Sequence, residues 1–167
     1  MSQTNYNEQD AGFLGLLADL TTHVMDSFTA EAAIVYGRFV ARGTNKTKQC
    51  KLPAAATDIT SRAARLGIAV TTQFIETPQN STADPQYPAN KSVNVMSFGR
   101  AWVECETATV DTSKDVYVRH AVDGGKNKLG VFSDTAGTGL VKLDNARWLS
   151  EDRSIDGKNL AIVEIRL

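Results

Sequence analysis

The residues best suited to catalysis or metal binding are two histidines and a short acidic segment that contains a cysteine. Histidine is the usual general base near neutral pH, and the chain has only His23 and His120. Glu104, Cys105 and Glu106 follow one another and, together with His120, could be drawn as a metal site. In a strand, however, alternation turns both glutamates to the face opposite the cysteine, so the ligands would not converge. We therefore expect no metal site here.

No sequence motif for catalysis or nucleotide binding offers another kind of site. The chain lacks the G-x-S-x-G elbow, the phosphate-binding loop and the H-E-x-x-H pattern. Gly137-Thr138-Gly139 lacks the third glycine of a dinucleotide fingerprint and is expected to be a turn. Carboxylates such as Glu104, Asp111 and Asp115 could pair for glycoside hydrolysis, but acidic residues at strand ends are normally only solvated. The sequence predicts neither an enzyme nor a cofactor.

Charge is nearly balanced over the 167 residues, with 18 basic and 19 acidic side chains and a net charge of −1. A general electrostatic attraction to nucleic acid or to an anionic membrane is therefore not expected. Between residues 38 and 51 the chain carries basic residues and no acid: Arg38, Arg42, Lys46, Lys48 and Lys51. This run predicts either a solvated strand face and turn or a surface that docks on an acidic protein. Nucleic acid is the weaker interpretation, because only Phe39 offers a ring for stacking.

Cysteine content and the N-terminus indicate the compartment. Cys50 and Cys105 cannot build a disulfide framework, and no C-x-x-C is present. The first ten residues are polar and lack the basic and apolar regions of a signal peptide. No apolar run approaches the roughly 18 residues of a membrane-spanning helix. We expect a soluble protein with reduced cysteines, made inside the cell.

From residue 31 onward, the chain consists largely of short segments in which apolar and polar residues alternate. These segments must position any functional site. Ala101, Val103 and Cys105 are expected on one face of a strand and Trp102 on the other. Residues 76–91 hold three of the four prolines and predict a long surface loop. Further segments predict strands at 67–72, 92–96, 115–119, 129–132, 140–143 and 160–167, and one or two helical turns within 54–65. This pattern predicts an all-β body, a small barrel or sandwich, with minor helix.

The first thirty residues differ from the rest. A polar start leads into a segment with Gly12 and Gly15, each of which weakens a helix by about 1 kcal/mol relative to alanine. The segment carries an apolar cluster of Phe13, Leu14, Leu16 and Leu17. We predict an extended arm over residues 1–30, mobile in the free subunit and ordered on a partner, followed by one β-rich body over 31–167. The alternatives are a short helix over 16–25, or a cluster that completes the body's own core.

The order of these segments along the chain is itself informative. They are Gly12–Asp19, Glu31–Gly37, Val40–Thr44, Cys50–Pro53, Leu66–Val70, Val93–Met96, Gly99–Val103, Asp115–Arg119, Leu129–Phe132, Ala146–Leu149 and Leu160–Ile165. As a set, over roughly residues 12–167, this order resembles the structural cement, or head decoration, proteins of tailed bacteriophages. The identification rests on the set, because no single motif is diagnostic.

The resemblance implies a non-enzymatic protein of the virion, made in the host cytoplasm. Such a protein binds the outer capsid surface and stabilises the head against the pressure of its DNA. It implies the major capsid protein as a partner and a homotrimer, or as second choice a homodimer, with no direct contact to nucleic acid or membrane. The residues that we expect at the capsid or subunit interface are Phe13, Leu14, Leu16, Leu17, Arg38, Arg42, Lys46 and Lys48.

Two other functions stay open on the residues alone. A carbohydrate-binding or adhesin-type β-domain of a virion would need aromatic rings exposed on one face, and the candidates are Trp102, Tyr117, Phe132 and Trp148. Large rings more often belong to a core or an interface. A small β-barrel enzyme is the less favoured alternative, because the chain offers no clear general base.

Overall fold

The computed structural model describes residues 14–18, 22–71, 84–149, 153–155 and 158–167. The described elements are β1 (Val24–Ala30), β2 (Ile34–Val35), β3 (Phe39–Arg42), β4 (Gln49–Lys51), α1 (Ala56–Thr60), β5 (Arg65–Val70), β6 (Gln86–Tyr87), β7 (Ser92–Cys105), β8 (Tyr117–Arg119), β9 (Phe132–Ser133), β10 (Leu140–Lys142), β11 (Ala146–Trp148), β12 (Arg153–Ile155) and β13 (Lys158–Arg166). The predicted all-β fold is confirmed, and α1 lies within the expected helical stretch.

Five strands close a small barrel in the order β1-β4-β3-β5-β7, and β7 returns to pair with β1. The β1–β4 pair is parallel, and the other neighbours in the ring are antiparallel. Strand β5 approaches β7 very closely at Gly67, where an added Cβ would lie 2.0 Å from the carbonyl oxygen of Met96. Glycine is therefore required at this position for the barrel to close.

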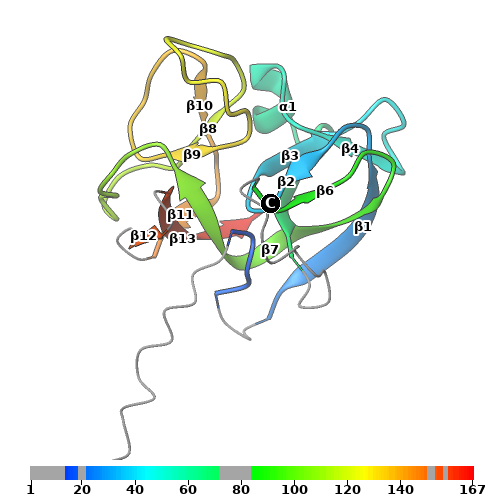
Figure 1. Ribbon diagram of the computed structural model, residues 1–167, viewed down its shortest axis with the longest axis horizontal. Helices are drawn as coiled ribbons and strands as arrows, with labels where there is room; N and C mark the ends of the chain where they lie inside the picture. Colours follow the sequence, from blue (N-terminus) through cyan, green and yellow to red (C-terminus); the bar gives the residue numbers. More distant parts are fainter. Residues whose placement is uncertain (1–13, 19–21, 72–83, 150–152, 156–157) are drawn as a thin grey trace, which may run out of the picture.

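The second half of the chain extends the sheet beyond the barrel. The C-terminal half of β7 pairs with β13, which also pairs with β11 and β12. At Cys105, β7 meets β9 in a parallel bridge to Phe132, and β8 and β10 continue from there. Figure 1 shows these strands, in yellow to red, on the opposite side of the molecule from blue β1. Strand β7 thus belongs to both halves and joins them.

The two halves have separate cores on opposite faces of β7. The barrel core takes side chains from all five barrel strands, including Val40, Cys50, Val93 and Val95. The second core contains Phe39, Ile68, Phe132, Trp148 and, from β7, Ala101, Val103 and Cys105, while Trp102 packs on the barrel core. The predicted alternation at residues 101–105 is therefore confirmed.

The structure differs from the predicted elements at two places. The predicted strand at 92–96 and the segment Gly99–Val103 belong to one element, since β7 runs unbroken through Gly99, where an added Cβ would lie 2.9 Å from the Cβ of His23. The alternative helix over 16–25 is wrong, because Leu17 forms an antiparallel bridge to Ala101 and β1 begins at Val24. Much of the expected 76–91 loop lies outside the described residues, and its described end contains β6, which pairs with β2.

Candidate functional site

The described part of the predicted arm lies on the body of the same chain. Gly15 donates its backbone N–H to the carbonyl of Trp102, whose own N–H bonds to the carbonyl of Leu16, with both N···O distances 2.9 Å. Leu14 is only 5% exposed in the barrel core, and Leu17 packs against the second core. These contacts support the alternative in which the cluster completes the protein's own core. Phe13 lies outside the described residues, and the division at residue 30 stays a prediction.

The basic run from Arg38 to Lys51 is divided by the fold. Arg38 is only 3% exposed, and its guanidinium is 2.6 Å from a carboxylate oxygen of Glu104, so it is not available to a docking partner. Arg42 is half-buried beside Phe28 and donates from Nη1 to the carbonyl of Lys46 at 2.7 Å. Lys46 and Lys48 are exposed between β3 and β4. The run therefore presents an exposed turn rather than one continuous basic face.

Glu104 and Glu106, at the end of β7, form the centre of an ion-pair network, which we name the acidic cluster. Glu104 bonds to Arg38 and Lys128, and Glu106 bonds to Arg119 and lies 3.4 Å from Lys126. Burial alone would raise the pKa of Glu106, but hydrogen bonds and charges from Arg119 and Lys126 outweigh it, and the pKa is lowered. In this cluster, each buried charged side chain is paired with a side chain of opposite charge, as in an ion-pair network that belongs to the fold.

The metal and catalytic candidates do not converge into a site. In the part of the chain that the structure describes, no group of three or more His, Cys, Asp and Glu side chains is placed to hold a metal ion. His120 follows β8, partly buried, and its backbone N–H bonds to the carbonyl of Gly139 at 2.8 Å. Burial raises the pKa of the Cys50 and Cys105 thiols to about 11. None of the described helices is long and apolar enough to cross a membrane.

An exposed apolar patch lies where β1 begins against β7. Val24 is 49% exposed, Met25 37% and Phe98 36%, and Val24 is the register partner of Phe98. The guanidinium carbon of Arg166 lies 5.9 Å from the centre of the Phe98 ring. Grouped apolar side chains on a surface are typical of contact sites. Sequence reasoning missed this patch, because the pairing of β1 with β7 joins segments that are far apart in the chain.

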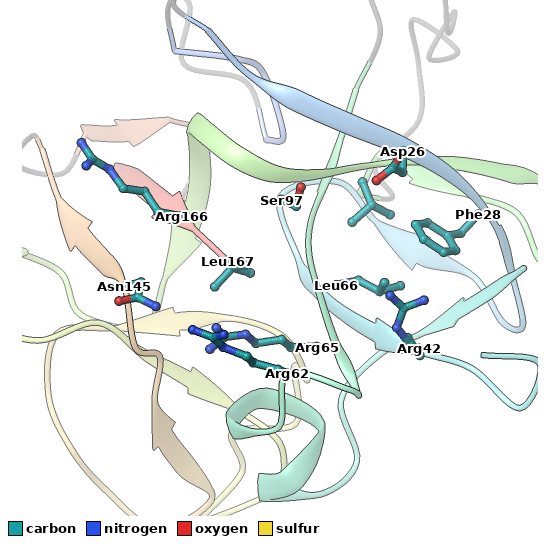
Figure 2. Close-up of a pocket in the computed structure, with 11 residues that line it drawn as sticks. Asp26, Phe28, Arg42, Arg62, Arg65, Leu66, Ser97, Asn145, Arg166 and Leu167 are labelled. Atoms are coloured by element: carbon teal, nitrogen blue, oxygen red, sulfur yellow. The ribbon is translucent and has the colours of Figure 1, made fainter. Parts of the chain in front are cut away.

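The end of the barrel nearest α1 and β13 opens into a cavity of about 470 Å³, which we name the barrel mouth. Its lining residues come from β1, β3, β5, β7 and the chain around β11 and β13: Asp26, Phe28, Arg42, Arg62, Arg65, Leu66, Val95, Ser97, Asn145, Arg166 and Leu167. In Figure 2, Arg62 and Arg65 are directed toward the Asn145 and Leu167 end, and Arg42 lies beside Phe28 at the other. Among the described residues that line it, the mouth has four arginines and one acidic side chain, Asp26.

A single buried carboxylate serves three arginines at one side of the mouth. Glu164 is 5% exposed and lies 2.8 Å from Arg147, 2.6 Å from Arg166 and 3.4 Å from Arg100. The hydrogen bond from Arg147 makes the largest contribution to lowering the pKa of Glu164, and Arg166 adds to it. Glu164 is therefore a carboxylate that these three arginines share.

Comparison with known proteins identifies the family to which this geometry belongs. The family model described as "Structural cement protein (E217 gp24/Pam3 gp6)" matches residues 2–167. The chain belongs to this family of phage cement proteins. The resemblance in the order of its segments is thereby confirmed, and the family places the protein in the virion capsid as a structural component.

A solved structure shares the fold of this cement protein. It is a chain from the structure titled "The capsid of Myoviridae Phage XM1", with a TM-score of 0.69 and 19% sequence identity. The match covers 99% of this chain and 98% of that chain. At this identity, the likeness shows a common fold over the whole length. No curated protein sequence matches the chain.

Proposed function

We propose that this protein binds the outer surface of a tailed-phage head and stabilises the shell against the pressure of packaged DNA. The observation that carries the proposal is the match of the cement family model to residues 2–167. The structure adds surfaces suited to contact, namely the exposed apolar patch of Val24, Met25 and Phe98 and the arginine-rich barrel mouth. The partner in this proposal is the major capsid protein.

The protein acts in this proposal as a homotrimer, with a homodimer as second choice. Closed symmetric oligomers are the commonest assemblies, and a neighbour can cover exposed sheet edges. Strand β10 is such an edge, because β8 is its one partner among the described strands. The predicted interface residues Leu16, Arg42, Lys46 and Lys48 are half-buried or exposed and remain candidates for these contacts.

The proposed role needs no catalysis, cofactor, nucleic acid or membrane. Stabilisation by a cement protein comes from the area that it buries across capsid subunits. The family is a structural one, which supports a non-enzymatic role. A head reconstruction tests the proposal: purified protein is added to heads that lack it, and the copies are located. Density on the outer surface together with a higher temperature of DNA release supports the proposal, and heads of unchanged stability contradict it.

The carbohydrate-binding alternative receives less support from the aromatic side chains. Phe132 is fully buried and Trp148 is 3% exposed, and their rings pack edge to face with centroids 6.4 Å apart. Trp102 and Tyr117 are half-buried. These four rings therefore do not form an exposed platform on which a sugar could stack. Binding of the purified protein to a glycan array would favour this alternative.

A further inference from the structure

We propose that the barrel mouth is the docking site for an acidic segment of the capsid-forming protein, whose carboxylates are held by Arg42, Arg62 and Arg65. The identity of this partner rests on the proposed function, whereas the preference of the mouth for carboxylates rests on the geometry. Cavities at the mouths of β-barrels are common binding sites, and about 470 Å³ is within the usual size range.

Arg65 provides the main evidence. The residue lines the mouth and is 8% exposed. In the described part of the chain, it makes no hydrogen bond or ion pair through its guanidinium, although its backbone N–H bonds to Ser61. The nitrogens of its guanidinium are not among the buried side-chain atoms that lack a partner, so they reach the open mouth, where a carboxylate can accept their hydrogen bonds. The other two buried arginines, Arg38 and Arg119, each have a glutamate.

The charges around Arg65 increase the demand for an anion. Arg62 is exposed and, among the described residues, has no ion-pair partner, and Arg42 bonds to a carbonyl rather than to a carboxylate. Arg166 shares Glu164 with two other arginines. Among the described lining residues, Asp26 is the one acidic side chain, and the nearby Asp115 and Asp144 line a neighbouring cavity with Arg62 and Arg65. A guanidinium presents paired donors that match a carboxylate, so three of them can hold more than one acidic side chain.

The remaining lining favours a polypeptide over a nucleic acid. Leu66, Val95 and Leu167 offer apolar contact, and Ser97 and Asn145 offer hydrogen-bonding groups that can meet a peptide backbone. Binding of a single-stranded nucleic acid depends on exposed rings for stacking. Phe28 is the one ring among the described lining residues, and the guanidinium carbon of Arg42 lies 6.0 Å from its centre. The net charge of −1 also argues against a general attraction to phosphates.

The first experiment measures binding to phage heads that lack the protein. R62Q/R65Q removes two positive charges from the mouth, and K91Q/K126Q removes two from exposed positions outside it. We expect the mouth variant to bind heads at least about tenfold more weakly, since each hydrogen bond to a charged group contributes substantially. The control should bind within about twofold of the wild type. Equal binding by the wild type and R62Q/R65Q overturns the docking site but leaves the proposed function intact.

The second experiment uses the free protein and a probe of known chemistry. Fluorescein-labelled octaglutamate is titrated by anisotropy, with labelled oligothymidylate as a parallel arm. We expect octaglutamate to bind the wild type, to bind R62Q/R65Q at least about tenfold more weakly, and to dissociate as salt screens the charges. Preference for oligothymidylate overturns the proposal. If the wild type fails to bind heads, the proposed function and the partner fail, while this titration still decides whether the mouth takes carboxylates.

Sedimentation velocity distinguishes the remaining source of an acidic segment, a second copy of this chain. We expect the wild type and R62Q/R65Q to show the same sedimentation coefficient at each concentration. A wild type that self-associates through the mouth, with an R62Q/R65Q variant that does not, overturns the proposal in favour of a self-interface. Circular dichroism of both variants confirms that the fold is retained, so that weaker binding reports the lost charges.

Discussion

The acidic cluster and the barrel mouth both contain buried arginines, but the two regions differ in whether a carboxylate of the chain pairs with them. In the cluster, Glu104 and Glu106 give Arg38 and Arg119 a carboxylate each, and lysines cover the outside. In the mouth, Arg65 is almost as buried, but no carboxylate reaches it from the described residues. The paired arginines are held within the fold, whereas the guanidinium of Arg65 reaches the open mouth and is available to a carboxylate of another molecule.

The largest expected effect comes from removing a carboxylate of the acidic cluster, where the buried arginines are paired. Glu104→Gln leaves the Arg38 charge buried without its carboxylate, and we expect the free energy of unfolding to fall by about 3–5 kcal/mol in urea titrations. Arg65→Gln removes a guanidinium that reaches the open mouth and has no ion pair among the described residues, so we expect a change within about 0.5 kcal/mol. Similar losses in the two variants would remove the distinction between the regions. The double variant R38M/E104L should recover most of the lost stability, because neither charge remains.

A substitution at Gly67 tests whether the shape of the mouth depends on the close approach of β5 and β7. In Gly67→Ala, the new Cβ would overlap the carbonyl oxygen of Met96, which lies 2.0 Å away, so β5 must move away from β7. We expect a loss of about 1–3 kcal/mol in unfolding free energy, as for overpacked cores. The adjacent Leu66 and Arg65 would move with the strand, and octaglutamate binding should weaken. Gly137→Ala is the matched control, because its backbone is not in the left-handed region and an added Cβ there makes only an ordinary contact, 3.5 Å from a side-chain carbon of Leu140. Unaltered stability in Gly67→Ala would contradict this close packing.

Acid should weaken the ion pairs of Glu106, in the acidic cluster, and of Glu164, beside the mouth. The folded-state pKa values of Glu106 and Glu164 are lowered, so both carboxylates add stability above the unfolded value of about 4.3, and this stability is lost as pH falls through the folded values. We expect the Tm to stay level from pH 8 to 6 and to drop below about pH 4.3. Glu106→Gln should flatten the drop, and Arg65→Gln should leave it unchanged. Differential scanning calorimetry across pH measures both, and an equally steep drop in Glu106→Gln would refute this assignment.

The smallest expected effect concerns the two thiols, which probe how far the mouth penetrates. Cys50 belongs to the barrel core and Cys105 to the second core, and burial raises both pKa values to about 11. At pH 8 only about one thiol in a thousand is ionised, so both should react slowly with Ellman's reagent in the folded protein. Faster reaction of Cys50, measured in the C105S variant against C50S, would show that the mouth opens into the barrel core.

The sequence predicts the strands better than it predicts the sites. Alternation alone assigns Ala101, Val103 and Cys105 to one face, because a strand has a fixed period of two. It cannot show that β1 pairs with β7, a pairing that places the Ser27 hydroxyl 3.1 Å from the side chain of Asn94, 67 residues later. The barrel, and therefore its mouth, exists only through such distant pairings.

The charged residues show the same limit. Arg38 belongs to a run of basic residues and was expected at an interface, but its partner Glu104 is 66 residues away in the sequence. A usable signal was present at Arg65, since it directly precedes Leu66-Gly67-Ile68 and so begins a strand whose residues are all buried. A charge at the start of a fully apolar strand is a reason to look for a binding site there.

The closure of the barrel by its first strand also determines when the protein can fold during synthesis. Strand β1 pairs mainly with β7, so this pairing cannot form until about 70 further residues have been synthesised. Contacts between residues far apart in the sequence slow folding, because the entropy cost of closing the loop between them precedes the free energy gained from pairing. Until then Phe28 and Ala30, which pack in the barrel core of the folded protein, are uncovered apolar residues. Chaperones that bind nascent chains would therefore find this segment before the barrel forms.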